Sequence, residues 1–298
     1  MLKIALQLPN DIHLPCFVYG FLKPGELAHD QISDFVGQHV VDAVAGQLRI
    51  WDGLPLLGLR DESSACGYLL HSNAPESLYK AIIAFEPADQ YKWAEVTTQH
   101  GQLANVLLGR QKPYDNAVPI PANSFTSGED VVLTRGLEAA RIALWRAQPS
   151  YGREEYYFFD VQMSYMLISS VFERFLSLRY GPLLKPMQKV LALARDPKWA
   201  EAVTCVKSIK DLTAVYRSDS GELTKVHFDR ADPEGSAKFF YQFRSNLMHR
   251  GKGAIRDVAR LKDAANGFLE ALQELWASYN LPWLADTTLL DDCNSGFV

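Results

Sequence analysis

Cysteine is scarce in this chain. Its 298 residues include only Cys16, Cys66, Cys205 and Cys293, which lie far apart and form no CxxC pair. This spacing argues against a zinc ribbon or a disulfide framework and is typical of a reducing compartment, so we expect a cytoplasmic protein. The 7 histidines are scattered, and none stands beside a pair of carboxylates at ligand spacing, so we expect no metal site and no cofactor.

The sequence also lacks a long apolar run. No stretch approaches the roughly 20 residues that a membrane-spanning helix needs. The opening MLKIALQLPNDIHLP holds one lysine, a short apolar stretch and then an acidic residue, which is unlike a secretory signal. A hydrophobic content of 48% with 22% charged residues is ordinary for a folded protein, and we expect no membrane partner.

Neither sign of charge dominates the chain, since 30 basic residues face 35 acidic ones. Residues 1–148 carry 11 basic and 16 acidic residues, whereas residues 149–298 carry 19 of each. One segment departs from this balance, because between residues 236 and 262 seven basic side chains face Asp257 alone. Such a segment is typical either of contact with phosphate groups or of a solvated basic face, and charge alone weighs the two equally.

Proline and glycine are concentrated in the first half of the chain. Nine of the 15 prolines and 11 of the 19 glycines precede residue 149, where short apolar runs between turn residues predict strands. The runs are CFVYGFL, VAGQLRIW, LPLLGL, ACGYLLHS, WAEVTTQH and QLANVLLG. The near-helical spacing of Leu78, Ile82, Ile83 and Phe85 predicts one helix in APESLYKAIIAFE.

Long segments with helical periodicity make up the second half. They are YYFFDVQMSYMLISSVFERFLSLRYG, LLKPMQKVLALARD, WAEAVTCVKSIKDLTAVY, AKFFYQFRSNLMHRG and AIRDVARLKDAANGFLEALQELWASYN. The aromatic clusters YYFF and FFYQF are expected to fill the core of a helical bundle. We therefore predict an α+β protein with a small mixed β-barrel domain over residues 1–112, a linker over 113–135, an all-α bundle over 136–282 and a tail over 283–298.

Four short motifs of the first half follow one another in a set order. VYGFLKPG comes first, AGQLRIWDGLPLL and CGYLLHS follow, and a helix leads into AFEPADQYKWAEVTTQHG. Over roughly residues 15–110 this order resembles the γ-glutamylcyclotransferase-like family. The resemblance implies that Tyr19, Gly20 and Leu22 line a loop around a small γ-glutamyl-like or other carboxylate ligand. It also implies that Glu86 is the catalytic acid and base.

The resemblance implies a reaction as well. In that family the α-amine of the substrate attacks the γ-carbonyl group and releases 5-oxoproline, and a buried carboxylate can accept the amine proton and return it to the leaving group. Ala84, Phe85 and Pro87 would supply apolar surroundings that raise the pKa of Glu86. Phe21 departs from the family pattern, which has a small polar residue there, and it borders the ligand site. The alternative is that Glu86 is an exposed glutamate at a helix end.

The run RSNLMHRGKG ends a predicted helix of the second half. It places four residues between Arg244 and His249, and an arginine, four to six residues and a histidine on a late helix of a bundle resemble the HEPN family. The resemblance covers roughly residues 150–280 and implies a homodimer whose paired motifs cut RNA. Read from the residues alone, the run is a solvated helix end, because basic side chains suit the C-terminal end of a helix and glycine suits its cap.

RNA cleavage without a metal uses the ribose 2′-OH as the nucleophile. Histidine suits the proton transfer and arginine the charge on phosphorus, so His249 and Arg244 are the expected catalytic pair. Glu173 is expected either to orient Arg244 or to pair with Arg174 or Arg179. The residues expected to contact RNA are Ser245, Asn246, Arg250 and Lys252.

Three functions stay open on the sequence. The favoured one is a metal-independent endoribonuclease of HEPN type with a sensing or regulatory first domain, suited to stress response or, as a toxin, to phage defence. The second is a cyclotransferase that releases 5-oxoproline from a γ-glutamyl compound, with the bundle as a dimerisation module. The third is a binding or scaffold protein with no catalytic activity.

Overall fold

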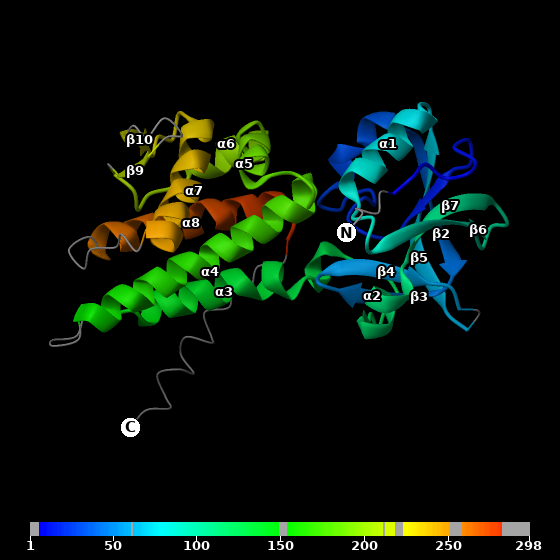
Figure 1. Ribbon diagram of the computed structural model, residues 1–298, viewed down its shortest axis with the longest axis horizontal. Coiled ribbons are helices and arrows are strands. Elements are labelled where there is room, and N and C mark those ends of the chain that lie inside the picture. Colours follow the sequence, from blue (N-terminus) through cyan, green and yellow to red (C-terminus); the bar gives the residue numbers. More distant parts are fainter. Residues whose placement is uncertain are drawn as a thin grey trace, which may run out of the picture. The chain divides into compact units, whose positions relative to one another are not determined.

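A computed structural model of the chain describes residues 6–60, 62–148, 154–210, 212–217, 223–250 and 258–281. The chain forms two compact units, which Figure 1 shows in the colours of the sequence. Unit 1 comprises Met1–Asp130 and Ser177–Leu184, and unit 2 comprises Val131–Leu176 and Lys185–Val298. The chain therefore passes from one unit to the other after residues 130, 176 and 184.

A five-stranded sheet forms the larger part of unit 1, with the strand order β2-β5-β1-β7-β6. Its strands are β1 (Cys16–Val18), β2 (Val36–Ala45), β5 (Ser64–Ser72), β6 (Tyr91–Thr97) and β7 (Leu103–Gly109). The central pair β1 and β7 is parallel and the other pairs are antiparallel. All three residues of β1 are buried and apolar, as expected of a strand in the middle of a sheet.

A second, three-stranded sheet has the order β4-β3-β8, from β3 (Gln47–Trp51), β4 (Leu54–Gly58) and β8 (Val118–Pro119). The expected closed β-barrel does not form among the described strands. The edge strand β2 meets the residues after β6 through a bridge between Val44 and Thr98, a hydrogen bond of 2.8 Å from the Gln99 N–H to the Ala43 carbonyl, and a contact of 3.0 Å between the His100 ring and Asp42. The edges therefore touch at one end without a continuous ladder.

The expected strands and helix of the first half are present, with one addition. Each of the six apolar runs contains a strand, and the expected helix is α1 (Pro75–Phe85). The ten-residue strand β2 was not predicted, because most of its residues are exposed and its sequence VGQHVVDAVA shows no regular alternation of apolar and polar residues. The segment expected as a linker holds most of α2 (Gln111–Asn116), β8, the 3₁₀ turn Ser127–Glu129 and the start of α3.

Two short 3₁₀ helices, η1 (His29–Gln31) and η2 (Ser33–Phe35), connect β1 to β2. Helix α1 follows β5 and begins at Pro75. Proline suits the first turn of a helix, because N–H groups in that turn have no acceptor within the helix and proline has no N–H. Its buried face consists of Leu78, Tyr79, Ile82 and Phe85. The helix ends where Glu86 adopts an extended backbone, so the end of α1 sets the position of this glutamate.

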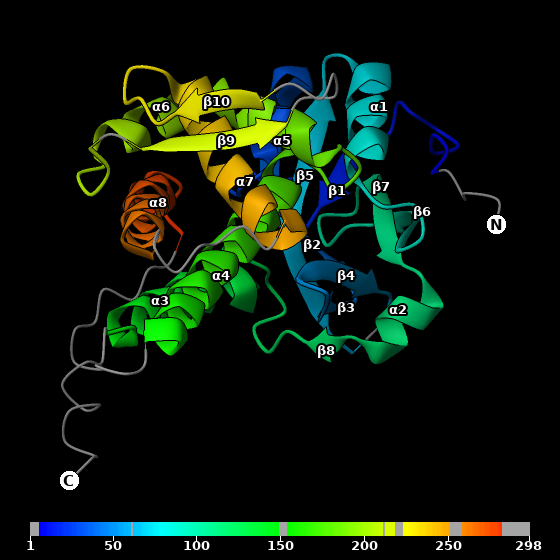
Figure 2. The same ribbon diagram turned by 60° about the vertical axis from the view of Figure 1, so that its left-hand side comes forward.

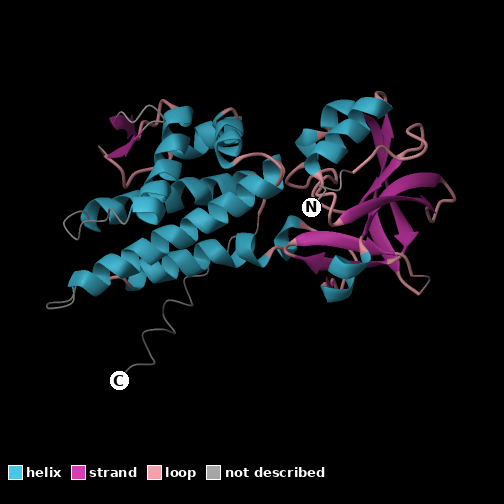
Figure 3. Cartoon of the chain, in the orientation of Figure 1, coloured by secondary structure: helices cyan, strands magenta, loops and turns pink. Residues whose placement is uncertain are grey.

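Unit 2 consists mainly of helices, as Figure 3 shows by the contrast between cyan helices and magenta strands. They are α3 (Val131–Arg146), α4 (Glu154–Tyr180), α5 (Pro186–Ala194), α6 (Pro197–Thr204), α7 (Pro233–Arg250) and α8 (Val258–Ser278). Gly181 follows α4 with a positive φ of 98°, the conformation that a glycine cap supplies. Among the described residues, no helix is both long enough and apolar enough to cross a membrane.

The prediction of an all-α second domain was wrong in one place. The expected helix WAEAVTCVKSIKDLTAVY is α6 followed by strand β9 (Thr213–Arg217), which pairs with β10 (Leu223–His227) in a hairpin beside α7 (Figure 2). Glu270 accepts hydrogen bonds from the N–H groups of Lys207 and Ser208 at 2.6 and 3.0 Å and fixes the loop after α6. The β-branched and aromatic residues that follow favour a strand.

Aromatic side chains form the core of unit 2. The rings of Phe240 and Phe268 stack with their centroids 4.3 Å apart, and Phe172 meets Phe268 edge to face at 5.0 Å. This core joins α4, α7 and α8, and truncating such a ring to alanine costs about 3–5 kcal/mol. The prediction for FFYQF is confirmed by the buried pair Phe239 and Phe240. In YYFF only Phe158 is buried in this way, whereas Tyr156 and Phe159 are exposed. The YYFF cluster therefore contributes little to the core.

Candidate active site

A pocket lies in unit 1, between the end of β1, the start of β4 and the end of α1. The cavity volume is ≈ 40 Å³, and ≈ 470 Å³ when the open mouth and the solvent space in front of it are included. Its walls combine the loop after β1 with one side chain each from β6 and β7. The lining residues are Cys16, Phe17, Val18, Tyr19, Gly20, Phe21, Leu22, Leu54, Pro55, Ile82, Phe85, Glu86, Tyr91 and Leu107. All five residues predicted for a ligand site in the first domain are therefore in one place.

Tyr19 holds the loop to the two sheets. Its hydroxyl donates a hydrogen bond of 2.6 Å to the Leu107 carbonyl on β7 and accepts one of 3.3 Å from the Leu57 N–H on β4. The side chain is only 5% exposed. Both bonding capacities of the hydroxyl are thus directed to the protein, so Tyr19 shapes the pocket through its ring and keeps its oxygen away from a ligand.

Gly20 lets the loop approach β4 closely. A Cβ atom at this position would lie 2.8 Å from Cγ of Pro55, so any larger residue would force the loop and β4 apart.

Among the residues that the structure describes, none accepts a hydrogen bond from the backbone N–H groups of Gly20, Phe21 or Leu22. Successive N–H groups in a turn can hold an anion such as a carboxylate.

Glu86 is partly buried and lines the pocket at the C-terminal end of α1. Its own N–H bonds to the Ile82 carbonyl at 2.9 Å, which fixes its backbone to the helix. Within the described part of the chain, no group forms a hydrogen bond with its carboxyl. Burial raises the pKa of this carboxyl to about 8. The alternative of an exposed glutamate at a helix end is therefore wrong.

Three other ionisable groups surround the Glu86 carboxyl. Burial raises the pKa of the Tyr19 and Tyr91 hydroxyls and of the Cys16 thiol, and a negative charge on Glu86 raises all three further. The Tyr91 hydroxyl donates a hydrogen bond of 2.8 Å to the Pro55 carbonyl. All three groups therefore stay protonated near neutral pH. Glu86 is the one group of the pocket lining that exchanges a proton there.

Phe21 forms part of the apolar wall. Its side chain is 3% exposed, and its ring meets that of Phe125 edge to face with the centroids 4.8 Å apart. This packing fixes the side chain beside the pocket, and its ring excludes water from that wall. The position that the sequence marks as a departure from the family pattern is thus a built part of the site.

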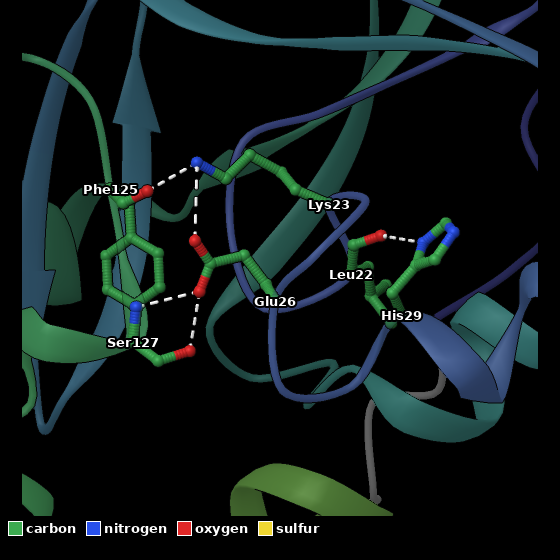
Figure 4. Close-up of polar contacts among 6 residues, drawn as sticks. All are labelled: Leu22, Lys23, Glu26, His29, Phe125 and Ser127. Atoms are coloured by element: carbon green, nitrogen blue, oxygen red, sulfur yellow. Dashed lines mark hydrogen bonds and ion pairs between the residues drawn. The ribbon is translucent and has the colours of Figure 1, made fainter. Parts of the chain in front are cut away.

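An ion pair between Lys23 and Glu26 holds the loop in place, as Figure 4 shows. The ammonium of Lys23 donates to the Phe125 carbonyl and lies 3.9 Å from a carboxylate oxygen of Glu26. The other oxygen of Glu26 accepts the N–H of Ser127 at 2.8 Å and its hydroxyl at 2.6 Å. Burial lowers the pKa of Lys23, and Glu26 counteracts this shift. The loop is thus joined to a segment about a hundred positions away in the sequence.

Two further contacts hold the same loop. Arg179, near the end of α4, donates to the Leu27 carbonyl at 3.0 Å and pairs with Asp30 at 2.7 Å. One nitrogen of the His29 ring bonds to the Leu22 carbonyl at 2.9 Å. Sequence reasoning missed Arg179 in this role, because the helical pattern around it carries no sign of a partner so distant in the chain.

In unit 2, Arg244 pairs with Glu173 across α7 and α4. One terminal nitrogen of the guanidinium lies 2.9 Å from the nearer carboxylate oxygen of Glu173 and 3.2 Å from the other. The side chains are 22% and 37% exposed. Burial lowers the pKa of the neighbouring Lys189, and the Glu173 charge counteracts this shift. Of the partners expected for Glu173, Arg244 is in contact with it, and a pairing with Arg174 or Arg179 stays a prediction.

The remaining predicted residues of unit 2 are only partly described. Ser245 and Asn246 are half-buried, and the Asn246 side chain accepts a hydrogen bond of 3.1 Å from Gln242. His249 and Arg250 belong to the last turn of α7, but their side chains lie outside the description, as does the whole of Lys252. The catalytic pairing of Arg244 with His249 therefore stays a prediction.

Comparisons with known proteins leave the family of this chain open. No family model and no curated protein matches it. A solved structure of the uncharacterized protein PH0828 from Pyrococcus horikoshii is 20% identical with a TM-score of 0.32, and the match covers 38% of this chain and 89% of that one. An allophanate hydrolase variant from Kluyveromyces lactis is 12% identical with a TM-score of 0.32, and the match covers 38% of this chain and 20% of that one. Neither likeness carries an argument about function.

Proposed function

We propose that unit 1 is a cyclotransferase, which converts a γ-glutamyl compound into 5-oxoproline and a free amine. The observation that supports this most directly is the Glu86 carboxyl, which lines the pocket and has a pKa of about 8. The loop that lines the same pocket has three backbone N–H groups that donate to no described residue. An acid of this pKa exchanges protons close to neutral pH, as acid and base catalysis requires. Among the functions open on the sequence, the geometry favours this one over RNA cleavage.

Each group of the site has a role in the proposed reaction. The N–H groups of Gly20, Phe21 and Leu22 would hold the α-carboxylate of the γ-glutamyl group. The neutral α-amine attacks the γ-carbonyl carbon, and a C–N bond forms while Glu86 takes a proton from the attacking nitrogen. Glu86 then returns this proton to the leaving nitrogen as the original amide bond breaks. The products are 5-oxoproline and the amine, and Glu86 ends in the state in which it began.

The protein's contribution beyond proton transfer is positioning. The reaction is intramolecular, so a pocket that folds the substrate with its amine against its γ-carbonyl supplies much of the rate. The loop is suited to this task because Tyr19 and the Lys23–Glu26 pair fix it from two sides. Such support keeps the N–H groups at constant positions relative to Glu86.

The test is the release of 5-oxoproline from a panel of γ-glutamyl compounds, measured by chromatography. The wild type should form 5-oxoproline, and Glu86→Gln should reduce the rate by about 10²–10⁴, which is the usual contribution of a general acid and base. Glu95→Gln, an exposed glutamate on β6, is the matched control and should retain full activity. A Glu86→Gln protein as active as the wild type would overturn the proposal.

RNA cleavage by unit 2 is a second candidate function, and the Arg244–Glu173 ion pair favours it. A carboxylate that holds the guanidinium in one orientation would present its remaining donors to a phosphate group. In this proposal Arg244 and His249 act in a homodimer, and Ser245, Asn246, Arg250 and Lys252 contact the RNA.

This second proposal has its own experiment. Wild type, Arg244→Gln and His249→Ala would each be incubated with total cellular RNA in EDTA. Fragments that end in a 2′,3′-cyclic phosphate are expected from the wild type and absent from both variants, whereas Lys238→Gln, on the exposed side of α7, should match the wild type. Intact RNA with the wild type, or equal cleavage by all four proteins, would overturn it.

A further inference from the structure

The walls of the Glu86 pocket carry almost no charge. Apart from Glu86, none of its fourteen lining residues is a carboxylate, and none is lysine, arginine or histidine. Leu54 and Pro55 on β4, together with Ile82 and Phe85 on α1, face the same space. The Glu86 carboxyl is therefore the one charged group of the lining, and the hydroxyls of Tyr19 and Tyr91 are already bonded to backbone groups of the protein.

The pocket provides for one anion. The loop supplies three backbone N–H groups that donate to no described residue, and the α-carboxylate of a γ-glutamyl group would occupy them. A second carboxylate on the ligand would meet apolar walls and the Glu86 carboxyl itself. Burying an unpaired charge is costly, and a like charge nearby adds to this cost.

Two basic side chains that contact the loop already have partners in the protein. Lys23 is bound to the Phe125 carbonyl and to Glu26, and Arg179 is bound to the Leu27 carbonyl and Asp30. Neither of them lines the pocket. Turning one of them toward a ligand would leave a buried carbonyl and a carboxylate without their partners. A second carboxylate thus finds no cation among the described residues that line this pocket.

Phe21 extends the apolar surface where a small polar residue would offer a hydrogen bond. Its ring is buried against Phe125 and lines the pocket. The ring offers a ligand dispersion contact and no donor. The wall on this side thus favours a hydrocarbon group over a polar one.

We infer that the pocket takes γ-glutamyl amides whose amine portion is apolar and uncharged, such as γ-glutamyl alkylamides, in preference to γ-glutamyl amino acids, whose amine portion carries a carboxylate. The inference rests on the proposed function for the γ-glutamyl half of the ligand, and the pocket walls specify the other half. The bonds that form and break are those of the cyclisation described above, and the product that leaves with 5-oxoproline is an alkylamine.

A matched pair of compounds tests this preference. γ-Glutamylisobutylamide and γ-glutamylvaline differ only by the carboxylate on the amine portion. Each would be titrated by calorimetry into the Glu86→Gln protein, in which binding is measured without turnover, and each would be assayed for 5-oxoproline with the wild type. We expect the isobutylamide to bind at least about tenfold more tightly, because the valine carboxylate is desolvated without a partner. Equal or tighter binding of γ-glutamylvaline, or no binding of either compound, would overturn the inference.

A charge placed in the wall sharpens the test. Leu54 lines the pocket at the start of β4 and is 9% exposed, so Leu54→Lys can place an ammonium at the mouth. The preference should shrink to about equality or invert in this variant, because the lysine pairs with the valine carboxylate. Leu54→Met is the control of similar size and should keep the wild-type preference. An unchanged preference in a folded Leu54→Lys protein would count against the inference.

The two proposals fail in different ways. Selective binding of the isobutylamide with no 5-oxoproline from either compound would overturn the cyclotransferase reaction and leave the inferred specificity in place. Formation of 5-oxoproline at equal kcat/KM from both compounds would support the reaction and overturn the specificity.

Discussion

Two glutamates of this protein occupy opposite environments. Glu86 lines an apolar pocket of unit 1, and no described group hydrogen-bonds to its carboxyl, which burial shifts to a pKa of about 8. Glu173 in unit 2 is 37% exposed and is held by Arg244 at 2.9 Å. An unpaired acid in an apolar pocket is ready to accept and release a proton, whereas a paired carboxylate keeps its charge and fixes its partner.

The two proposed functions rest on this difference. Unit 1 combines a concave site with a group that changes protonation near neutral pH, as an enzyme for a small molecule needs. In unit 2, Glu173 holds the 22% exposed guanidinium of Arg244, which the second proposal assigns to a phosphate group of RNA. The predictions below test this comparison, from the largest expected effect to the smallest.

The largest effect should separate the two glutamates in one assay. Glu86→Gln is expected to lower the kcat for 5-oxoproline formation by about 10²–10⁴, because the proton acceptor is removed while its shape is kept. Glu173→Gln should leave this rate unchanged, since Glu173 does not line the pocket. Equal losses in both variants would mean that the comparison is wrong.

The pH dependence of the rate should report the Glu86 carboxyl. With a pKa of about 8, roughly one molecule in eleven carries the carboxylate at about pH 7. If the carboxylate is the base, kcat/KM should rise about tenfold from this pH to a plateau above about pH 9. A rate that is flat over this range, or that rises only below about pH 5, would show that another group takes the proton.

The stability of the protein should depend on pH through the same carboxyl. Its pKa is raised from 4.5 in the unfolded chain to about 8, so the folded state binds the proton more tightly. Stability from this group is complete below the unfolded value and declines as the pH rises from 4.5 to about 8. Relative to Glu86→Gln, the wild type should lose about 1–3 kcal/mol of unfolding free energy over this pH range. The full pKa shift corresponds to a larger loss, and the partial exposure of Glu86 to solvent reduces it.

Urea unfolding of both proteins at about pH 5 and about pH 9 checks this dependence. The curve of Glu86→Gln should move less between the two pH values than that of the wild type. Identical shifts in the two proteins would place the cause at other titrating groups.

The smallest effect belongs to the pair in unit 2. A double-mutant cycle with Glu173→Gln and Arg244→Gln should give a coupling energy of about 0.5–1 kcal/mol, because both side chains are partly exposed and screened by solvent. Denaturation at low and high salt provides the measurement, and the coupling should decrease with added salt. A coupling that salt does not affect would indicate a buried pair, contrary to the observed exposure.

Local patterns of the sequence predicted much of the fold. The apolar runs between turn residues located six strands, and the spacing from Leu78 to Phe85 located α1. The strand β2 was missed because most of its residues are exposed, so its sequence shows no alternation of apolar and polar residues. The hairpin β9–β10 was missed because the residues of β9 continue the helical spacing of the apolar residues before them. Patterns of this kind record which face is buried, and they are silent where neither face is.

The candidate site was predicted only in its local parts. The motif order identified the loop from Tyr19 to Leu22 and Glu86, and the structure brings all of them to one pocket. The supports of the loop were not foreseen. Ser127 lies 101 positions from Glu26, and Arg179 lies 149 positions from Asp30, so no local pattern marks either contact. Such pairings follow from the tertiary fold alone.

The path of the chain limits how unit 1 can be separated from the rest of the protein. Unit 1 includes Ser177–Leu184, which arrives only after nearly all of α4 has been made. A fragment that ends at residue 130 would lack Arg179 and leave the Leu27 carbonyl and Asp30 without it. Newly synthesised unit 1 therefore cannot be complete until residue 184 has left the ribosome. For the same reason, recombination that exchanged only the first 130 residues would transfer an unfinished domain.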